Sequence, residues 1–239
     1  MTSRTCILGL FTNALLATAC ASGGTTTGKE VRLDPPPGNV ASEVTIPRWT
    51  CTPATTTAAP ADGLISDFSG KGGLPGQIST AVPPDSSGVT LSQTMDAGRL
   101  VVDVKGAASA KPQVLTVTRV FDGCVDAHGF AGVQFSLSGS LSGCSMTYAT
   151  IDPEHQWYQA GGPYPPQKKI SADEVTSTPR TITAPFLNPE IPGSPATPVD
   201  ASKLAAIQWL IIVPVAPEDG NAATACAGKI FINDIKLYH

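Results

Sequence analysis

The sequence predicts an all-β fold, an antiparallel β-sandwich that follows a disordered N-terminal tether. Glycine and proline number 23 and 22 of the 239 residues and charged residues make up only 14%, a composition typical of turns and short strands. Short segments with alternating apolar and polar residues recur between turn signals. No amphipathic helix longer than the single turn at Asp200–Leu204 is evident.

The first twenty residues have the features of an export signal. Arg4 gives a basic start, residues 6–19 are mostly apolar, and small residues precede Cys20. The apolar run is too short for a permanent membrane span. Residues 16–20 resemble the lipobox of bacterial lipoproteins, which implies a signal peptide over residues 1–19 and lipidation of Cys20, although Ala17 stands where the lipobox usually has Leu. The alternative is an ordinary secretory signal cleaved near residue 19 or 21.

Residues 20–61 are expected to form a tether rich in Thr, Pro and Gly, because they contain little that could build a core. A flexible chain of this length spans roughly 35 Å, enough to lift a domain clear of a lipid surface. In bacteria with two membranes, Ala21 after the lipidated cysteine indicates sorting to the outer membrane. Cys51 complicates the tether, because a disulfide there would pin its distal end to the domain.

Four cysteines remain beyond the signal, and an even number in an exported chain indicates disulfides. None has the Cys-x-x-Cys spacing of a zinc or redox site. Three connectivities are open, and we expect Cys124–Cys144 together with Cys51–Cys226.

The globular domain is expected over residues 62–239. It begins with a strand at Leu64–Phe68 and closes with one at Lys229–His239, and we expect these two strands to pair, as the ends of a chain commonly do in closed sandwiches. The remaining expected strands are Val89–Met95, Arg99–Lys105, Gln113–Phe121, Phe130–Ser138, Cys144–Ile151, Arg180–Phe186 and Leu204–Val213. Two long connections, 152–179 and 188–198, interrupt them, and loops of such length often carry function.

Four short motifs in this order look like those of a known family. They are Gly63-Leu-Ile-Ser-Asp-Phe68, Cys124-Val-Asp-Ala-His-Gly-Phe-Ala-Gly-Val-Gln-Phe135, Ser202-Lys-Leu-Ala-Ala-Ile-Gln-Trp209 and Ile232-Asn-Asp-Ile235. The chain thereby resembles the galactose-binding-like jelly rolls of bacterial surface lipoproteins and is similar to the family 11 type of carbohydrate-binding module, whose typical opening is "IDDFED" and whose closing strand reads "IDDI".

The resemblance implies a jelly-roll sandwich that binds sugar without catalysis. Two departures matter. Residues 69–72, Ser-Gly-Lys-Gly, stand where the family often has acidic residues, which puts a calcium site in doubt. Leu210 stands where a polar residue is common, which makes one sugar-facing position apolar.

Aromatic rings that stack on sugars, with amides and hydroxyls that bind sugar hydroxyl groups, are the natural ligand residues. The candidates are Gln134, Thr147, Tyr148, Trp157, Tyr158 and Tyr164. The alternative is that Tyr148 belongs to the core and that the loop aromatics cover the sandwich.

Asp67 and Asp234 lie on the first and last strands, where their carboxylates are candidates for a structural Ca²⁺. The alternative is that both acids bind backbone N–H groups or water. No other cofactor is indicated.

Signals for catalysis are poor. No nucleophile elbow, zinc-binding helix or phosphate loop is present. His128 and His155 stand in loops. Three acid pairs could each suggest a glycosidase, but all lie among turn residues, and two carboxylates so near in sequence seldom flank a scissile bond: Asp152 with Glu154, Asp173 with Glu174, and Glu218 with Asp219. We therefore expect no enzyme.

The formal net charge of −4 argues against nucleic acid as a partner. The sequence predicts a lipid-anchored surface protein that binds a polysaccharide or cell-surface glycan. The alternative is a structural or adhesive sandwich that binds protein.

Overall fold

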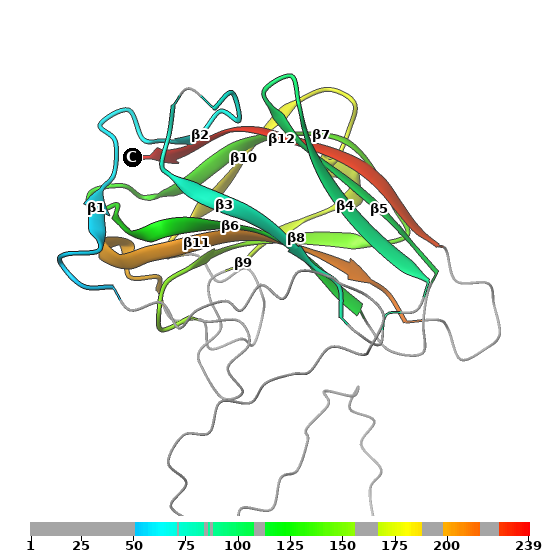
Figure 1. Cartoon of the computed structure of the whole chain (residues 1–239). Coiled ribbons are helices and arrows are strands. Elements are labelled where there is room, and N and C mark those ends of the chain that lie inside the picture. The colour runs from blue at the N-terminus through cyan, green and yellow to red at the C-terminus, as the bar shows by residue number, and fades with distance from the viewer. Residues whose placement is uncertain are drawn as a thin grey trace, which may run out of the picture. The chain divides into compact units, whose positions relative to one another are not determined.

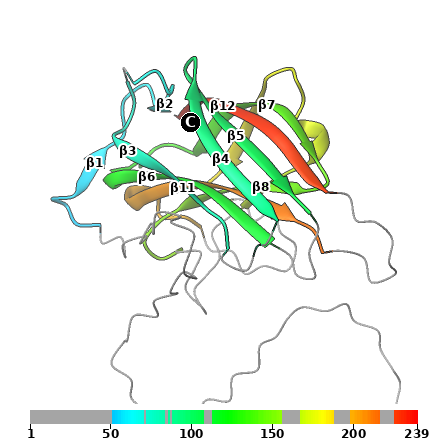
Figure 2. The same ribbon diagram turned by 45° about the vertical axis from the view of Figure 1, so that its right-hand side comes forward.

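The computed structural model describes residues 51–70, 72–83, 86, 88–107, 113–155, 167–187, 198–215 and 225–239. Two six-stranded sheets pack face to face, as Figures 1 and 2 show from two directions. This confirms the predicted all-β sandwich. The described residues contain no α-helix, only the 3₁₀ turns η1 (Ala172–Glu174) and η2 (Ala201–Lys203). No helix in this part of the chain has the length and hydrophobicity that a membrane span requires.

Sheet A has the strand order β1-β6-β11-β8-β9, with β3 also pairing with β6. Its strands are β1 (Thr56–Ala58), β3 (Gly76–Ala81), β6 (Gln113–Asp126), β8 (Ser145–Ile151), β9 (Gln167–Ile170) and β11 (Leu204–Val213). All its pairs are antiparallel except β1 with β6. Three of these strands, β1, β3 and β9, were not predicted from the sequence.

Sheet B has the order β10-β7-β12-β5-β4, with β2 pairing with β12. Its strands are β2 (Leu64–Ser66), β4 (Val89–Asp96), β5 (Arg99–Gly106), β7 (Gly132–Ser142), β10 (Arg180–Pro185) and β12 (Cys226–Tyr238). Ile235 lies opposite Ser66, and Lys236 opposite Leu64. The predicted pairing of the strand at Leu64–Phe68 with the closing strand is therefore confirmed.

The main core fills the space between the sheets because alternate residues of each strand point inward. Its centre is an aromatic cluster of Phe135 from sheet B with Tyr148 and Trp209 from sheet A, whose ring centroids lie 5.0 to 5.8 Å apart. Tilted and edge-to-face rings at these distances are the favourable geometries for aromatic packing. The cluster fixes which residues of β8 and β11 face inward and which face outward.

The disulfides are Cys51–Cys124 and Cys144–Cys226, so the expected connectivity is wrong although all four cysteines are paired. Cys124 lies near the end of β6, whereas Cys144 lies just before β8, at the opposite end of sheet A. About ten residues of strand, roughly 33 Å, separate these two ends, far beyond the reach of a disulfide. The nearness of Cys124 and Cys144 in the sequence therefore did not predict which cysteines form disulfides.

The first disulfide also places the start of the folded part upstream of residue 62. β1 pairs with the end of β6, with Thr56 opposite Cys124. The Cys124 backbone N–H donates to the Thr55 carbonyl oxygen at 2.9 Å. Thr56–Ala58 of the expected tether thus belong to sheet A, and Cys51 is bonded to that sheet through Cys124.

Candidate functional site: the outer face of sheet A

The outer face of sheet A carries a row of side chains across five strands, four polar and one an alanine; we call it the polar row. Residues directly opposite each other in antiparallel strands point to the same face. The register puts Thr118 and Ala149 on either side of Gln208, and the row continues to the sheet's two margins. From one margin to the other it is Ser79, Thr118, Gln208, Ala149 and Gln167.

The neighbouring rows mix hydroxyl groups with apolar side chains. Thr116, Leu210 and Thr147 form one row, and Ala206 and Ile151 lie on the other side of the polar row. Ala149, Ile151, Ala206 and Leu210 make a small apolar cluster separate from the main core. The face therefore combines apolar contact area with hydroxyl and amide groups, and its described residues in these rows carry one charge, Lys169 beside Thr147.

Gln208 is the unusual residue of this face. Its side chain is 2% exposed, and its amide nitrogen donates to the Thr118 hydroxyl at 2.9 Å. Its amide oxygen is buried and has no hydrogen-bond partner. Because a buried acceptor without a partner costs about 1–3 kcal/mol, such groups in a folded protein call for an explanation, and one explanation is a ligand that donates to it.

The structure separates the residues that the sequence suggested as a sugar site. Thr147 lies on the outer face of sheet A and is 5% exposed. Gln134 lies on β7 opposite Thr183, on the outer face of the other sheet. Trp157, Tyr158 and Tyr164 lie outside the described residues.

Tyr148 is placed in the core. It is 1% exposed, its hydroxyl lies 3.1 Å from that of Thr150, and burial raises its pKa despite this hydrogen bond. Its ring is packed between Phe135 and Trp209, so it cannot stack on a ligand from solvent. This position agrees with the core alternative for this residue.

Asp67 and Asp234 come from the paired strands β2 and β12 or the residues next to them. The Asp67 carboxylate accepts hydrogen bonds from the Ser69 N–H and hydroxyl at 2.9 and 2.8 Å, and that of Asp234 accepts one from the Asn233 amide at 3.2 Å. Among the described residues no three His, Cys, Asp or Glu side chains are grouped to hold a metal. Calcium prefers six to eight oxygens, so these two carboxylates alone do not make a complete site, and the cation stays a prediction.

Three of the acids considered for glycoside hydrolysis, Asp152, Asp173 and Glu174, have structural hydrogen bonds. Glu174 accepts from the Ser171 N–H at 2.8 Å and its hydroxyl at 2.7 Å, which caps η1. Asp152 accepts from backbone N–H groups, and Glu154 is exposed. Glu218 and Asp219 lie outside the described residues.

The outer face of sheet B differs from that of sheet A in being exposed and richer in charge. Hydroxyl groups of β7, among them Ser138 and Ser140, flank Phe231 and Lys229 of β12. The Arg99 guanidinium carbon lies 4.7 Å from the centroid of the Phe231 ring, a cation–π contact. This face therefore combines an aromatic ring, cations and hydroxyl groups in one exposed patch.

Gln208 and Thr118 were missed as site residues in the sequence, although Gln208 carried a signal. It is the one polar residue in the otherwise apolar run Leu204–Val213. A lone amide in a strand buried on both faces indicates either a structural hydrogen bond or a binding group.

The sequence matches no protein-family model, and a comparison with characterised proteins finds no related sequence. Solved structures that the chain is similar to include two family 11 carbohydrate-binding modules from Clostridium thermocellum. One, in complex with a β-1,3-1,4-mixed-linked tetrasaccharide, is 15% identical with a TM-score of 0.44, covering 74% of this chain and 94% of that one. The other, from the cellulosomal cellulase Lic26A-Cel5E, is 15% identical with a TM-score of 0.43, covering 76% and 96%. The agarase AgWH50C is 13% identical with a TM-score of 0.44, covering 72% of this chain and 24% of the agarase. The modules are of the family whose motifs the sequence resembles.

Proposed function

We propose that this chain is an exported protein, lipid-anchored through Cys20 at the bacterial envelope and sorted to the outer membrane, whose sandwich binds a glycan without catalysis. The observation that carries the glycan-binding function is the unpaired amide oxygen of Gln208, buried among hydroxyl groups on an apolar sheet face. A sugar presents hydroxyl donors and acceptors on a partly apolar ring. The groups beside Gln208 match these two properties of a sugar, because Thr118 and Thr147 carry hydroxyls and Leu210 is apolar. All three are at most 5% exposed, so a ligand reaches them only when this face opens.

A glycan also fits the charge of the face. The side chains of the polar row are neutral, and Lys169 at the margin is the one charge described in the rows beside it. Neutral hydroxyl and amide groups bind sugar hydroxyls without the desolvation cost that a buried charge would add. The face therefore favours an uncharged polysaccharide over an acidic one.

The test is affinity electrophoresis of the whole exported chain against mixed-linked β-1,3-1,4-glucan, β-1,4-glucan, xylan and agarose, with and without calcium. We expect retardation by at least one neutral polysaccharide. Gln208→Leu should abolish most of it, whereas Gln134→Leu, the same change on the outer face of sheet B, should leave it intact. No retardation by any polysaccharide would contradict the proposal.

Protein binding through the outer face of sheet B is the second candidate. The Phe231 ring with its neighbouring cations, Arg99 and Lys229, favours it, because aromatic and arginine side chains are enriched at the centres of protein interfaces. In that case the chain would bind no glycan, and Phe231→Ser would release an envelope protein that crosslinks to the wild type.

The lipid anchor has its own test. Metabolic labelling with an alkyne fatty acid should label the wild-type chain, and Cys20→Ser should remove the label. A chain that is exported but never labelled would favour the ordinary secretory signal.

A further inference from the structure

A buried carboxylate, that of Asp152, lies at one end of the outer face of sheet A. Asp152 follows β8 directly and is 1% exposed. It accepts hydrogen bonds from the backbone N–H groups of Glu154 and His155, both at 2.8 Å, and from the Nδ1 of the His155 ring at 2.8 Å. A fourth donor, the Asp200 N–H at 2.7 Å, comes from 48 residues further along the chain. The last contact joins the end of β8 to the segment that enters β11.

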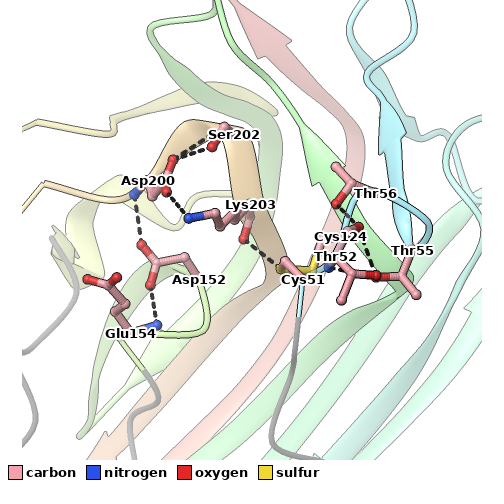
Figure 3. Close-up of a disulfide and its surroundings, with 10 residues drawn as sticks. All are labelled: Cys51, Thr52, Thr55, Thr56, Cys124, Asp152, Glu154, Asp200, Ser202 and Lys203. Atoms are coloured by element: carbon pink, nitrogen blue, oxygen red, sulfur yellow. Dashed lines mark hydrogen bonds and ion pairs between the residues drawn. A yellow bond between two sulfur atoms is a disulfide. The ribbon is translucent and has the colours of Figure 1, made fainter.

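Further contacts extend from Asp200 toward the Cys51–Cys124 disulfide, and Figure 3 shows them together with Asp152. The Asp200 carboxylate accepts from the Ser202 N–H at 3.0 Å and lies 3.0 Å from the Lys203 ammonium. The Lys203 carbonyl oxygen lies 3.7 Å from the Cys51 sulfur. Side-chain contacts thus join β8 to the start of β11 at this end of the sheet, and the disulfide that holds Cys124 of β6 lies against Lys203.

This end of sheet A adjoins the proposed binding face. Ile151 and Ala206 form the last row of the β8–β11 pairing, and Gln208 with Ala149 forms the next row on the same face. Two residues along a strand span about 7 Å, so Asp152 lies roughly 10 Å from the Gln208 row. A change in how the two strand ends meet would therefore move the groups of the face relative to each other.

We propose that Asp152 is a positioning residue for glycan binding, whose ionised carboxylate holds β8 and β11 in the arrangement that aligns Gln208 with its ligand. This rests on the glycan-binding function proposed above. Asp152 does not itself touch the ligand. It acts through His155 and Asp200, and the affinity of the face depends on its staying ionised.

The charges around Asp152 are compatible with an ionised state. Burial acts to raise its pKa, but the hydrogen bonds from the His155 ring and the Asp200 backbone outweigh burial, so the pKa lies below its ordinary value. The titratable groups that face it are Glu154, His155, Asp200 and Lys203. Since the carboxyl has a lowered pKa in the folded chain, its contribution is complete above its ordinary pKa and disappears as the pH falls through the lowered one.

The experiment compares Asp152→Asn with Glu154→Gln in the whole chain. Both variants remove one carboxylate charge from the same turn, but the Glu154 side chain is exposed and only its backbone N–H contacts Asp152. The probe is the polysaccharide of the panel that the wild type binds best. Three quantities are measured: affinity between pH 3 and pH 8, amide hydrogen exchange at Asp200, and the thermal midpoint.

We expect Asp152→Asn to bind about tenfold more weakly, the equivalent of one charge-assisted hydrogen bond, with faster exchange at Asp200 and a folded state at room temperature. Its affinity should lose the part of the acid decline that the wild type shows below about pH 4. Glu154→Gln should bind like the wild type. If Asp152→Asn does not fold, two variants of His155 replace it. His155→Asn keeps a hydrogen-bond donor near the position of Nδ1, whereas His155→Phe has none. Only His155→Phe should then bind the polysaccharide weakly.

Three results would overturn the proposal. The first is that Asp152→Asn binds as tightly as the wild type with unchanged exchange at Asp200. The second is that Glu154→Gln weakens binding as much as Asp152→Asn does. The third is that Asp152→Asn speeds exchange at Asp200 while its affinity stays constant, which would make the carboxylate merely structural. A wild type that binds no polysaccharide is a different failure: it refutes the glycan-binding function, whereas the exchange at Asp200 still reports whether Asp152 joins the two strands.

Discussion

The replacement of Gln208 by leucine tests the central feature of the proposed site through stability as well as binding. Gln208 is 2% exposed and donates one hydrogen bond, to Thr118, while its amide oxygen has no partner. Losing that bond costs about 1 kcal/mol, and removing an unpaired buried acceptor regains about 1–3 kcal/mol. The free energy of unfolding should therefore stay the same or rise by up to about 2 kcal/mol, even as glycan binding is lost.

The assay is urea unfolding at pH 7 followed by tryptophan fluorescence, because Trp209 lies in the core next to this position. Gln134→Leu is the matched control: its side chain is half-buried on the other sheet, so its unfolding free energy should change by less than about 0.5 kcal/mol. A fall of more than about 2 kcal/mol for Gln208→Leu would refute the reasoning, since it would mean that the amide is a structural group with both ends satisfied.

Three further perturbations follow from the fold. Tyr148→Phe removes a buried hydroxyl bonded to Thr150, so we expect a loss of about 1 kcal/mol in urea unfolding and unchanged glycan affinity; the opposite pattern would place Tyr148 in the ligand site. Replacing the cysteines of either disulfide by serine should lower the free energy of unfolding by up to about 4.5 kcal/mol. The two effects should be similar, because the disulfides join residues 73 and 82 positions apart, and an unchanged urea midpoint would contradict the pairing. Gly139→Ala should lower the thermal midpoint and reduce the free energy of unfolding by more than about 1 kcal/mol, because Gly139 has φ +127° and a Cβ there would overlap the Lys229 carbonyl oxygen. A midpoint equal to that of the wild type would show that β7 and β12 can separate locally.

The local pattern of the sequence was enough to predict most strands. The predicted strands Val89–Met95 and Arg99–Lys105 correspond to β4 and β5, which the structure pairs with Asp96 opposite Arg99. The three missed strands lacked such a pattern: β1 has three residues, β9 has four, and β3 contains only one large apolar residue, Ile78. They are strands because their backbones form hydrogen bonds with the edges of β6 or β8.

The disulfide pairing and the composition of the site depend on which strands are neighbours. Cys144 meets Cys226 because β7 and β12 pair, with Ala227 opposite Ser142, and Cys51 meets Cys124 because β1 pairs with the end of β6. In the same way, Thr118 and Gln208 are 90 residues apart in the chain and lie side by side only through the β6–β11 register.

The sequence by itself determined the class of the fold, the position of most strands and the inward-facing side of those that alternate clearly, since these follow from a period of two residues along one segment. The tertiary structure alone decided which outward residues meet: it placed Thr147 beside Leu210 and Gln134 on the opposite sheet. The reason is that a strand encodes its two faces locally, whereas its neighbours are selected by contacts between segments far apart in the chain, which no single segment specifies.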